Sequence, residues 1–253
     1  MSAGLTAMAL TDHDTLDGIS EAAAAATAAG IGFIPGTELS VDWPTGTMHL
    51  LVYHLGEGPG PLQDRLADLR RARDRRNHVI LERLARLGID IPYPEVEAES
   101  GGGVVGRPHI AAVLMARGLA TDIPDAFDRY LARDRPGYVD RERLAAAEAI
   151  DLARRSGAVP VIAHPHTLGV SRTDYGAAFS ELAAQGLGGI EAYYAEYPPE
   201  LRLHLAGLCD QLGLVATGGS DYHGRYKPDL QVGTGRGDLV VPDEVIDALM
   251  AAR

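Results

Sequence analysis

A chain of 253 residues, 46% of them hydrophobic, is long enough to bury a complete core, and its size suits a single-domain barrel. The net charge of -12 argues against a surface that coats nucleic acid or binds membranes through basic residues, although it permits a local basic cleft. The single cysteine, Cys209, excludes an internal disulfide and a thiolate-rich zinc site. The sequence has no apolar stretch long enough to span a membrane and no signal-peptide pattern, so we expect a cytoplasmic protein.

The scarcity of lysine bears on two common catalytic motifs. Lys227 is the only lysine among 23 basic residues and follows the last predicted strand, which argues against a Schiff-base lysine or a modified lysine that bridges two metal ions. A Walker-type loop, which needs Gly-Lys-Ser/Thr, is absent for the same reason. Residues 101–106 satisfy G-x-G-x-x-G but follow an acidic loop instead of a strand, so we expect a flexible loop there.

The chain opens with strands and helices in alternation. After the apolar run LTAMAL (5–10), an alanine-rich helix is predicted from Gly18 to Ala29 because a glycine follows it, and the strand GFIPG comes next. Trp43–Gly46 is predicted to be a hairpin turn that returns the chain into a strand from His49 to Leu55.

The alternation stops after residue 56, and we interpret residues 57–141 as a helical insertion. Its first helix is predicted from Pro61 to Leu87, with an apolar side of Leu62, Leu66, Leu69, Val79, Ile80, Leu84 and Leu87. The arginines of this helix are interpreted as a solvated face paired with acidic neighbours: Arg65, Arg70, Arg71, Arg73, Arg75 and Arg76 with Asp64, Asp68 and Asp74. Two short helices are predicted after Pro108 and from Pro124 to Arg133.

Regular alternation resumes at residue 142, which predicts a barrel domain formed by residues 1–56 and 142–253. The predicted helices cover 145–156, 177–185, 199–212 and a closing segment from Asp243. The predicted strands lead to His164, Tyr194 and Gly219.

Six apolar runs border residues that can bind a metal ion. They are LTAMAL before Thr11–Asp14, GFIPG before Thr37 and Glu38, HLLVYH from His49, VPVIA before His164, GGIEAYY at 188–194, and GLVATGG before Ser220–His223. Read as buried parallel strands, these runs would bring His, Glu and Asp side chains to one rim of a barrel or sheet. Such a rim predicts a hydrolase with a polynuclear metal site.

Five motifs at these positions resemble one known family. They are Thr11-Asp12-His13-Asp14, Gly36-Thr37-Glu38, His49-Leu50-Leu51, Ala163-His164-Pro165 and Gly219-Ser220-Asp221-Tyr222-His223. In this order, and over nearly the whole chain, they resemble the polymerase and histidinol phosphatase (PHP) family of metal-dependent phosphoesterases, most of all the branch that hydrolyses nucleoside 3',5'-bisphosphates and short oligonucleotide ends. The resemblance implies a distorted seven-stranded (βα) barrel that carries up to three divalent ions, usually manganese, iron or zinc.

The resemblance also implies a role for individual residues. Glu38 would bridge two ions, of which His49 and His164 complete the first. Asp221 would hold the second ion, and His13 with His223 would serve a third. Hydroxide bound to the ions would attack phosphorus, while Arg107 and His109, at the start of a predicted helix, would bind substrate phosphate. No side-chain nucleophile is expected.

One family motif is absent from this sequence. A strand that ends in His-x-His is expected about one βα unit before residue 5, whereas the chain begins at Met1. Three implied ligands are therefore missing, and only the ion of Glu38, His49 and His164 keeps its protein ligands. We expect a barrel without its first strand, through truncation or natural variation, with weakened activity, rearranged edges or strand exchange between subunits.

The remaining histidines are expected to be packed or at the surface instead of bound to metal: His54, His78, His166 and His204. Aromatic residues that end a strand are more often part of the core than a stacking platform for a base. We interpret three tyrosines in this way: Tyr193, Tyr194 and Tyr197.

The predicted function is hydrolysis of a phosphomonoester or phosphodiester in a small phosphorylated metabolite, nucleotide or short oligonucleotide. The alternatives are a metal-dependent amidohydrolase, against which the lone lysine argues, and a catalytically silent phosphate-binding protein. His, Glu and Asp ligands suit manganese, iron and zinc alike, so one to three ions of any of these kinds are expected. The sequence leaves the exact substrate and the oligomeric state open.

Overall fold

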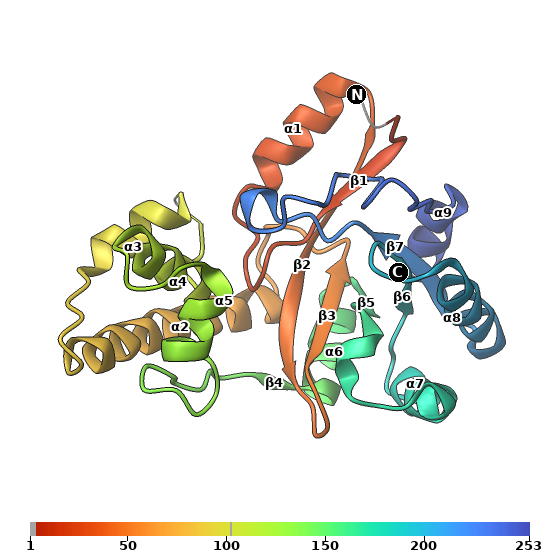
Figure 1. Cartoon of the computed structure of the whole chain (residues 1–253). Coiled ribbons are helices and arrows are strands. Elements are labelled where there is room, and N and C mark those ends of the chain that lie inside the picture. The colour runs from red at the N-terminus through yellow and green to blue at the C-terminus, as the bar shows by residue number, and fades with distance from the viewer. Residues whose placement is uncertain (1–3, 102) are drawn as a thin grey trace. The chain divides into compact units, whose positions relative to one another are not determined.

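The computed structural model of the protein describes residues 4–101 and 103–253 (Figure 1). The chain forms two compact units, the first of Met1–Gln63 with Leu144–Arg253 and the second of Asp64–Arg143. The second unit largely coincides with the segment 57–141 that we interpret as an insertion, and the domain boundaries at residues 56 and 142 stay a prediction.

The first unit is built on one mixed sheet. Its strands are β1 (Ala7–Leu10), β2 (Gly32–Asp42), β3 (Met48–Tyr53), β4 (Leu144–Ala145), β5 (Val159–Ile162), β6 (Gly189–Tyr194) and β7 (Val215–Gly219). The strand order is β1-β2-β3-β5-β6-β7, and β4 pairs with β2. In the described part of the chain no pairing joins β1 to β7, so the sheet is curled and open. The mixed α/β class is confirmed, and the distorted PHP-type barrel without its first strand stays a prediction.

The expectation of all-parallel strands is wrong for β3, which runs antiparallel to both β2 and β5. The reason is the short turn predicted at Trp43–Gly46. A connection of a few residues can only reverse the chain, because a parallel pair needs a crossover of a dozen or more residues. The other pairs, β1–β2, β2–β4, β5–β6 and β6–β7, are parallel.

Five helices follow strands of the first unit: α1 (Ile19–Ala29), α6 (Ala146–Arg155), α7 (Tyr175–Ala184), α8 (Pro199–Leu212) and α9 (Glu244–Ala251). The predicted helices agree with these bounds to within two residues. Gly30 ends α1 with a positive φ of 71°, a conformation that glycine adopts without strain. One core cluster of the unit joins Ile34 of β2, Leu51 of β3 and Val161 of β5 to Leu249 of α9.

The second unit is helical. Its helices are α2 (Pro61–Ala85, which begins in the first unit), α3 (Tyr93–Ser100), α4 (Arg107–Ala116) and α5 (Ile123–Ala126), and a π-helical turn at Phe127–Leu131 continues α5. Its core contains fully buried Ile80, Leu84, Ile110, Leu114 and Leu131. Helix α3 is not predicted by the sequence pattern, since the prolines and acidic residues around it resemble a loop.

Two details predicted for α2 are wrong. Val79 and Leu87, expected on its apolar side, are 37% and 50% exposed, and Leu87 lies beyond the end of the helix. Arg76, expected on a solvated face, is only 7% exposed. In contrast, Arg71 forms the expected exposed ion pair with Asp68.

Gly36 provides a test of the β2–β3 pairing that positions the residues described below. A Cβ atom at Gly36 would lie 2.6 Å from the backbone oxygen of Val52. Gly36→Ala is therefore expected to lower the free energy of unfolding by about 1–3 kcal/mol in a urea titration. Gly207→Ala in α8 is the matched control. No atom lies within 4 Å of a Cβ there, so it should raise that free energy by about 0.5–1 kcal/mol. Equal effects would contradict the close approach of β2 to β3 at Gly36.

Candidate metal centre

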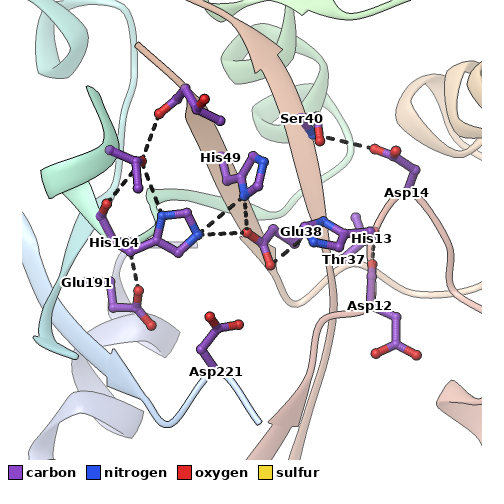
Figure 2. A network of polar contacts seen from close by, with 12 residues as sticks. Asp12, His13, Asp14, Thr37, Glu38, Ser40, His49, His164, Glu191 and Asp221 are labelled. Carbon is purple, nitrogen blue, oxygen red and sulfur yellow. Dashed lines mark hydrogen bonds and ion pairs between the residues drawn. The ribbon is translucent and has the colours of Figure 1, made fainter. Parts of the chain in front are cut away.

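The backbone of β2 brings Glu38 beside the residues that follow β1. The N–H of Glu38 donates to the carbonyl of Asp12 at 3.1 Å, and the N–H of Asp14 donates to the carbonyl of Glu38 at 3.0 Å. His13 and Glu38 thereby form an isolated parallel bridge, which continues the pairing of β1 with β2 past the end of β1. His49 enters from β3, where it pairs with Ser40. His164, which follows β5, is the fourth residue of the group, so four segments of the sequence meet here (Figure 2).

Three imidazole rings surround the buried carboxylate of Glu38 (Figure 2). Its Oε1 lies 2.7 Å from Nδ1 of His49 and 3.1 Å from Nε2 of His164. Its Oε2 lies 3.9 Å from Nδ1 of His13. The ring nitrogens of His49 and His164 are themselves 3.3 Å apart. The predicted ligands of the first ion therefore lie together, and His13 joins them.

The spacing of these donor atoms fits a metal ion. Ligand atoms about 2.1 Å from a tetrahedral ion lie roughly 3.4 Å from one another, close to the spacing of Glu38, His49 and His164. One donor from each of His13, Glu38 and His49 also falls within 4.8 Å of the other two. A carboxylate with neutral imidazoles suits manganese, iron or zinc. The assignment of these residues as ligands stays a prediction that this geometry supports.

The electrostatics of the group favour a positive charge next to Glu38. Burial opposes ionisation of Glu38, but the charge of His13 and hydrogen bonds from His164 and His49 outweigh it and hold the pKa of this carboxyl well below its usual range. Burial likewise opposes protonation of His164, yet Glu38 and Glu191 raise its pKa above the ordinary value. In the metal-free protein a protonated imidazole supplies the positive charge beside Glu38. A metal ion would compete with that proton for the ring nitrogen.

His164 is held in an unusual backbone conformation. Its φ of 27° and ψ of 65° lie where a residue other than glycine is strained, at a cost of about 1–3 kcal/mol. Two side chains support it: Glu191 Oε2 accepts from the N–H of His164 at 2.7 Å, and Thr167 Oγ1 lies 3.3 Å from its Nδ1. Such strain persists where the surroundings fix the residue, as is common at functional sites.

Thr167 favours a proton on Nδ1 of His164. Its hydroxyl donates to the carbonyl of Thr47 at 2.8 Å, so its oxygen can accept from Nδ1–H of His164. In the metal-free protein Nε2 is protonated as well and donates to Glu38; once that proton is lost, the ring would keep its proton on Nδ1 and offer the lone pair of Nε2 to a metal ion.

Thr167→Val removes this support while it keeps the shape of the side chain. We expect the variant to bind divalent metal about 10- to 100-fold more weakly, measured by competition with a chelator, because the ring of His164 loses its orienting partner. Thr173→Val, at an exposed residue whose hydroxyl contacts Ser171, is the control and should leave the affinity unchanged. An unchanged affinity in both variants would mean that Thr167 does not orient His164.

Asp221 and His223 follow β7 and form a second group beside the first. Tyr194 donates its hydroxyl proton to Asp221 Oδ2 at 3.1 Å, and the ammonium group of Lys227 contacts the same oxygen. Nδ1 of His223 lies 3.3 Å from Asp221 Oδ1. The rings of His13 and His223 have centroids 6.2 Å apart, so His13 connects the two groups. In Figure 2 the carboxylate of Asp221 points toward Glu38.

Glu191 is a site residue to which sequence reasoning assigned no role. It is 4% exposed, and burial raises its pKa to about 8, although the charge of His164 and the hydrogen bond from its N–H partly offset this. The signal was present in the sequence, since Glu191 is the one acidic residue within the apolar run GGIEAYY. A carboxyl group in a buried strand needs a polar partner, and here the partner is the candidate ligand His164.

The other histidines and tyrosines lie outside the group around Glu38. His166 Nδ1 contacts the hydroxyl of Tyr197 at 2.9 Å, the ring of His78 stacks on Tyr93, and His204 is exposed. Tyr194 and Tyr197 are buried, as expected of core residues. His54 and Tyr193 are partly buried.

Arg107 and His109 lie at the start of α4 in the second unit. Arg107 Nη1 donates to the carbonyl of Leu131 at 3.0 Å. His109 Nδ1 accepts from the N–H of Gly106 at 2.9 Å, so a neutral ring carries its proton on Nε2, where it can serve as a donor. Their role in phosphate binding stays a prediction. The segment 101–106 connects α3 to α4 and includes Gly102, which lies outside the described residues.

Comparison with known proteins identifies relatives along most of the chain, although no family model matches it. A 3',5'-nucleoside bisphosphate phosphatase of Chromobacterium violaceum is 32% identical over 225 residues, which cover 85% of this chain and 76% of that protein. The 5'-3' exoribonuclease Rnm of Salmonella typhimurium is 31% identical over 218 residues, which cover 85% of this chain and 74% of that protein.

Two solved structures share the fold. A protein of Bifidobacterium adolescentis described as a metal-dependent phosphoesterase has a TM-score of 0.84 at 28% identity, over 99% of this chain and 87% of that one. A protein of Chromobacterium violaceum named an amidohydrolase, with bound sulfate, has a TM-score of 0.80 at 28% identity, over 98% of this chain and 86% of that one.

Within the described residues no helix is both long and apolar enough to cross a membrane. The extent of these similarities, together with the residues gathered around Glu38, shows that the chain belongs to the PHP family of metal-dependent phosphoesterases.

Proposed function

We propose that the protein hydrolyses a phosphoester bond in a small nucleotide-like substrate at the edge of the sheet that carries Glu38. The observation that supports this most directly is the buried carboxylate of Glu38 in contact with the rings of His49 and His164, with His13 close by. Glu38, His49 and His164 would hold one ion, and Asp221 would share Glu38 with a second. His13 and His223 would serve a third.

The protein residues would contribute charge and position. When bound, divalent ions supply a hydroxide nucleophile near neutral pH and neutralise charge on the phosphoryl oxygens. Glu38 is ionised in advance because of its imidazole neighbours, and Thr167 and Glu191 hold His164 in place. Arg107 and His109 would donate hydrogen bonds to substrate phosphate. No serine, cysteine or lysine nucleophile is required.

The relatives narrow the substrate class. Their names refer to nucleoside 3',5'-bisphosphates and to 5'-3' degradation of RNA, and a solved neighbour holds sulfate, an analogue of phosphate in shape and charge. We therefore propose nucleoside bisphosphates or the ends of short oligonucleotides as substrates, with manganese, iron or zinc as the ion.

The test is reconstitution of the full chain with Mn²⁺, Fe²⁺ or Zn²⁺, followed by assays of phosphate release from adenosine 3',5'-bisphosphate and p-nitrophenol release from bis(p-nitrophenyl) phosphate. Metal-dependent turnover that a chelator abolishes and the same metal restores is the expected result. Hydrolysis of an amide without phosphoester turnover would indicate an amidohydrolase instead. Binding of the bisphosphate with no turnover under any metal would indicate a silent phosphate-binding protein.

A further inference from the structure

Tyr194 connects the two groups of candidate ligands in the first unit. It is the last residue of β6 and is 3% exposed. Its ring lies against the ring of His164, with centroids 5.7 Å apart, and its hydroxyl donates to Oδ2 of Asp221 at 3.1 Å. Tyr194 therefore contacts one candidate ligand from each group, a position that asks for a role beyond filling the core.

The side chain of Tyr194 is fixed by its neighbours. The ring of Tyr197 packs edge-on against it at 5.1 Å, and the ring of His166 stacks on it at 5.8 Å, measured between ring centroids. The backbone carbonyl of Tyr194 accepts from Nε of buried Arg202 at 3.1 Å. A hydroxyl on a ring held in this way stays at one point, so it can orient a carboxylate without further ordering.

The two carboxylate oxygens of Asp221 have different surroundings. Oδ2 accepts from the hydroxyl of Tyr194 and also contacts the ammonium group of Lys227. Among the contacts of the described residues, Oδ1 has only one, to Nδ1 of His223 at 3.3 Å, and that nitrogen lies closer to the backbone carbonyl of Asp221, at 2.7 Å. Since the carboxylate points toward Glu38 (Figure 2), Oδ1 is the oxygen that is more available to a metal ion beside Glu38.

The two partners of Oδ2 would respond differently to a cation at Asp221. The side chain of Lys227 is 35% exposed, and its ammonium group would be repelled by the ion, so it can move into solvent. The hydroxyl of Tyr194 is buried and neutral, and nothing repels it from the carboxylate. Tyr194 is therefore the partner that would stay on Oδ2 while Oδ1 binds a cation.

We propose that Tyr194 is a positioning residue that restricts Asp221 to binding a metal ion through Oδ1 alone, and that it thereby selects manganese, iron or zinc over calcium. Calcium takes about six to eight oxygen ligands and often binds both oxygens of one carboxylate. A carboxylate whose second oxygen holds a hydroxyl loses this mode, whereas transition-metal ions bind well to one oxygen. The inference rests on the proposed function in one respect, that Asp221 is a ligand of a second ion.

The test is titration of the full chain with Mn²⁺, in which electron paramagnetic resonance measures the free ion, followed by competition with Ca²⁺. Tyr194→Phe keeps the ring and removes only the hydroxyl. For the second, weaker ion we expect the ratio of the Kd for Ca²⁺ to the Kd for Mn²⁺ to fall about 10- to 100-fold in this variant, because Oδ2 becomes available to the larger ion. The affinity for the first ion, at Glu38, His49 and His164, should not change. An equal ratio in wild type and Tyr194→Phe would overturn the proposal.

Two further variants test whether the hydroxyl on Oδ2 is the cause. Tyr197→Phe removes a hydroxyl from the same cluster of rings, but this hydroxyl contacts His166 and not Asp221, so the ratio should match the wild type. Lys227→Met should strengthen the binding of both ions to a similar degree, because a competing charge is lost, and keep their ratio. A ratio that changes in Lys227→Met and not in Tyr194→Phe would overturn the proposal. Binding of a single ion by the wild type would also overturn it, since Asp221 would then not be a ligand.

The ratio of the two affinities separates positioning from a merely structural role. Loss of packing around Tyr194 would lower the melting temperature and weaken both ions alike, which leaves the ratio unchanged and contradicts the proposal. The measurement needs no substrate, so it is also independent of turnover. Phosphoester hydrolysis together with an unchanged ratio in Tyr194→Phe would overturn this inference while the proposed function stands. A changed ratio in a protein without turnover would support the inference and reject the proposed function.

Discussion

Replacement of Glu38 by glutamine is expected to lower kcat/KM for phosphoester hydrolysis by at least about a thousand-fold and to reduce the bound metal. The carboxylate contacts both His49 and His164, so it is the centre of the ligand group. Glutamine has nearly the same size but no negative charge, and it presents N–H groups where a cation would lie. Metal analysis and steady-state kinetics on the same preparations measure both effects.

The control for this variant is Glu181→Gln, which removes one negative charge from an exposed position of α7 and should leave both quantities unchanged. Circular dichroism at neutral pH should show that Glu38→Gln keeps its secondary structure. Full metal content and activity in this variant would mean that the ligand group is elsewhere, and the proposed function would lose its main support.

The convergence of His13, Glu38, His49 and His164 could be anticipated because each lies at or near the end of an apolar run. Ends of neighbouring strands meet at one edge of a sheet, so short motifs that are distant in the sequence become neighbours. Periodicity and glycine stops located the helices of the first unit for a related reason, since both are local properties of the chain.

The direction of β3 could also have been anticipated. His49 lies near the start of its strand, whereas His164 follows the end of β5. Two side chains at opposite ends of their strands meet at one edge only when the strands are antiparallel, as β3 and β5 are. The hairpin turn before His49 indicated the same reversal, and the assumption of uniform parallel strands overrode it.

Burial of charged groups could not be predicted from sequence alone. Arg76 belongs to a run of arginines on α2, and nothing in that run distinguishes it from exposed Arg71. In the folded chain Arg76 is buried beside Asn77, whose amide joins α2 to the lead-in of α4. The same applies to Glu191, whose environment depends on His164, a residue 27 positions earlier in the chain.

Glu191 should make the stability of the metal-free protein depend on pH. Burial raises its pKa from 4.5 to about 8, so between these pH values the folded state binds one proton more than the unfolded state. The free energy of unfolding should therefore fall by about 1.4 kcal/mol per pH unit across this window, about 5 kcal/mol in all as an upper bound. Glu191→Gln keeps an acceptor for the N–H of His164 and removes this contribution, while His164, whose pKa is also raised, still lowers the stability of both proteins as the pH rises above 6.5.

Urea titrations at pH 5 and pH 9 should show Glu191→Gln close to the wild type at the lower pH and more stable by several kcal/mol at the higher one. Glu38 does not change the slope of stability with pH between pH 4.5 and 8. Because its pKa is depressed, its ionised form stabilises the folded protein throughout this range, and that stabilisation is lost only as the pH falls below 4.5. Glu200→Gln, at an exposed position of α8, should match the wild type at both pH values.

A metal ion at Glu38 and His164 would favour ionised Glu191, so added metal should narrow the difference in stability between Glu191→Gln and the wild type at pH 9. A constant difference between Glu191→Gln and the wild type across the window would show that Glu191 is not protonated in the folded protein.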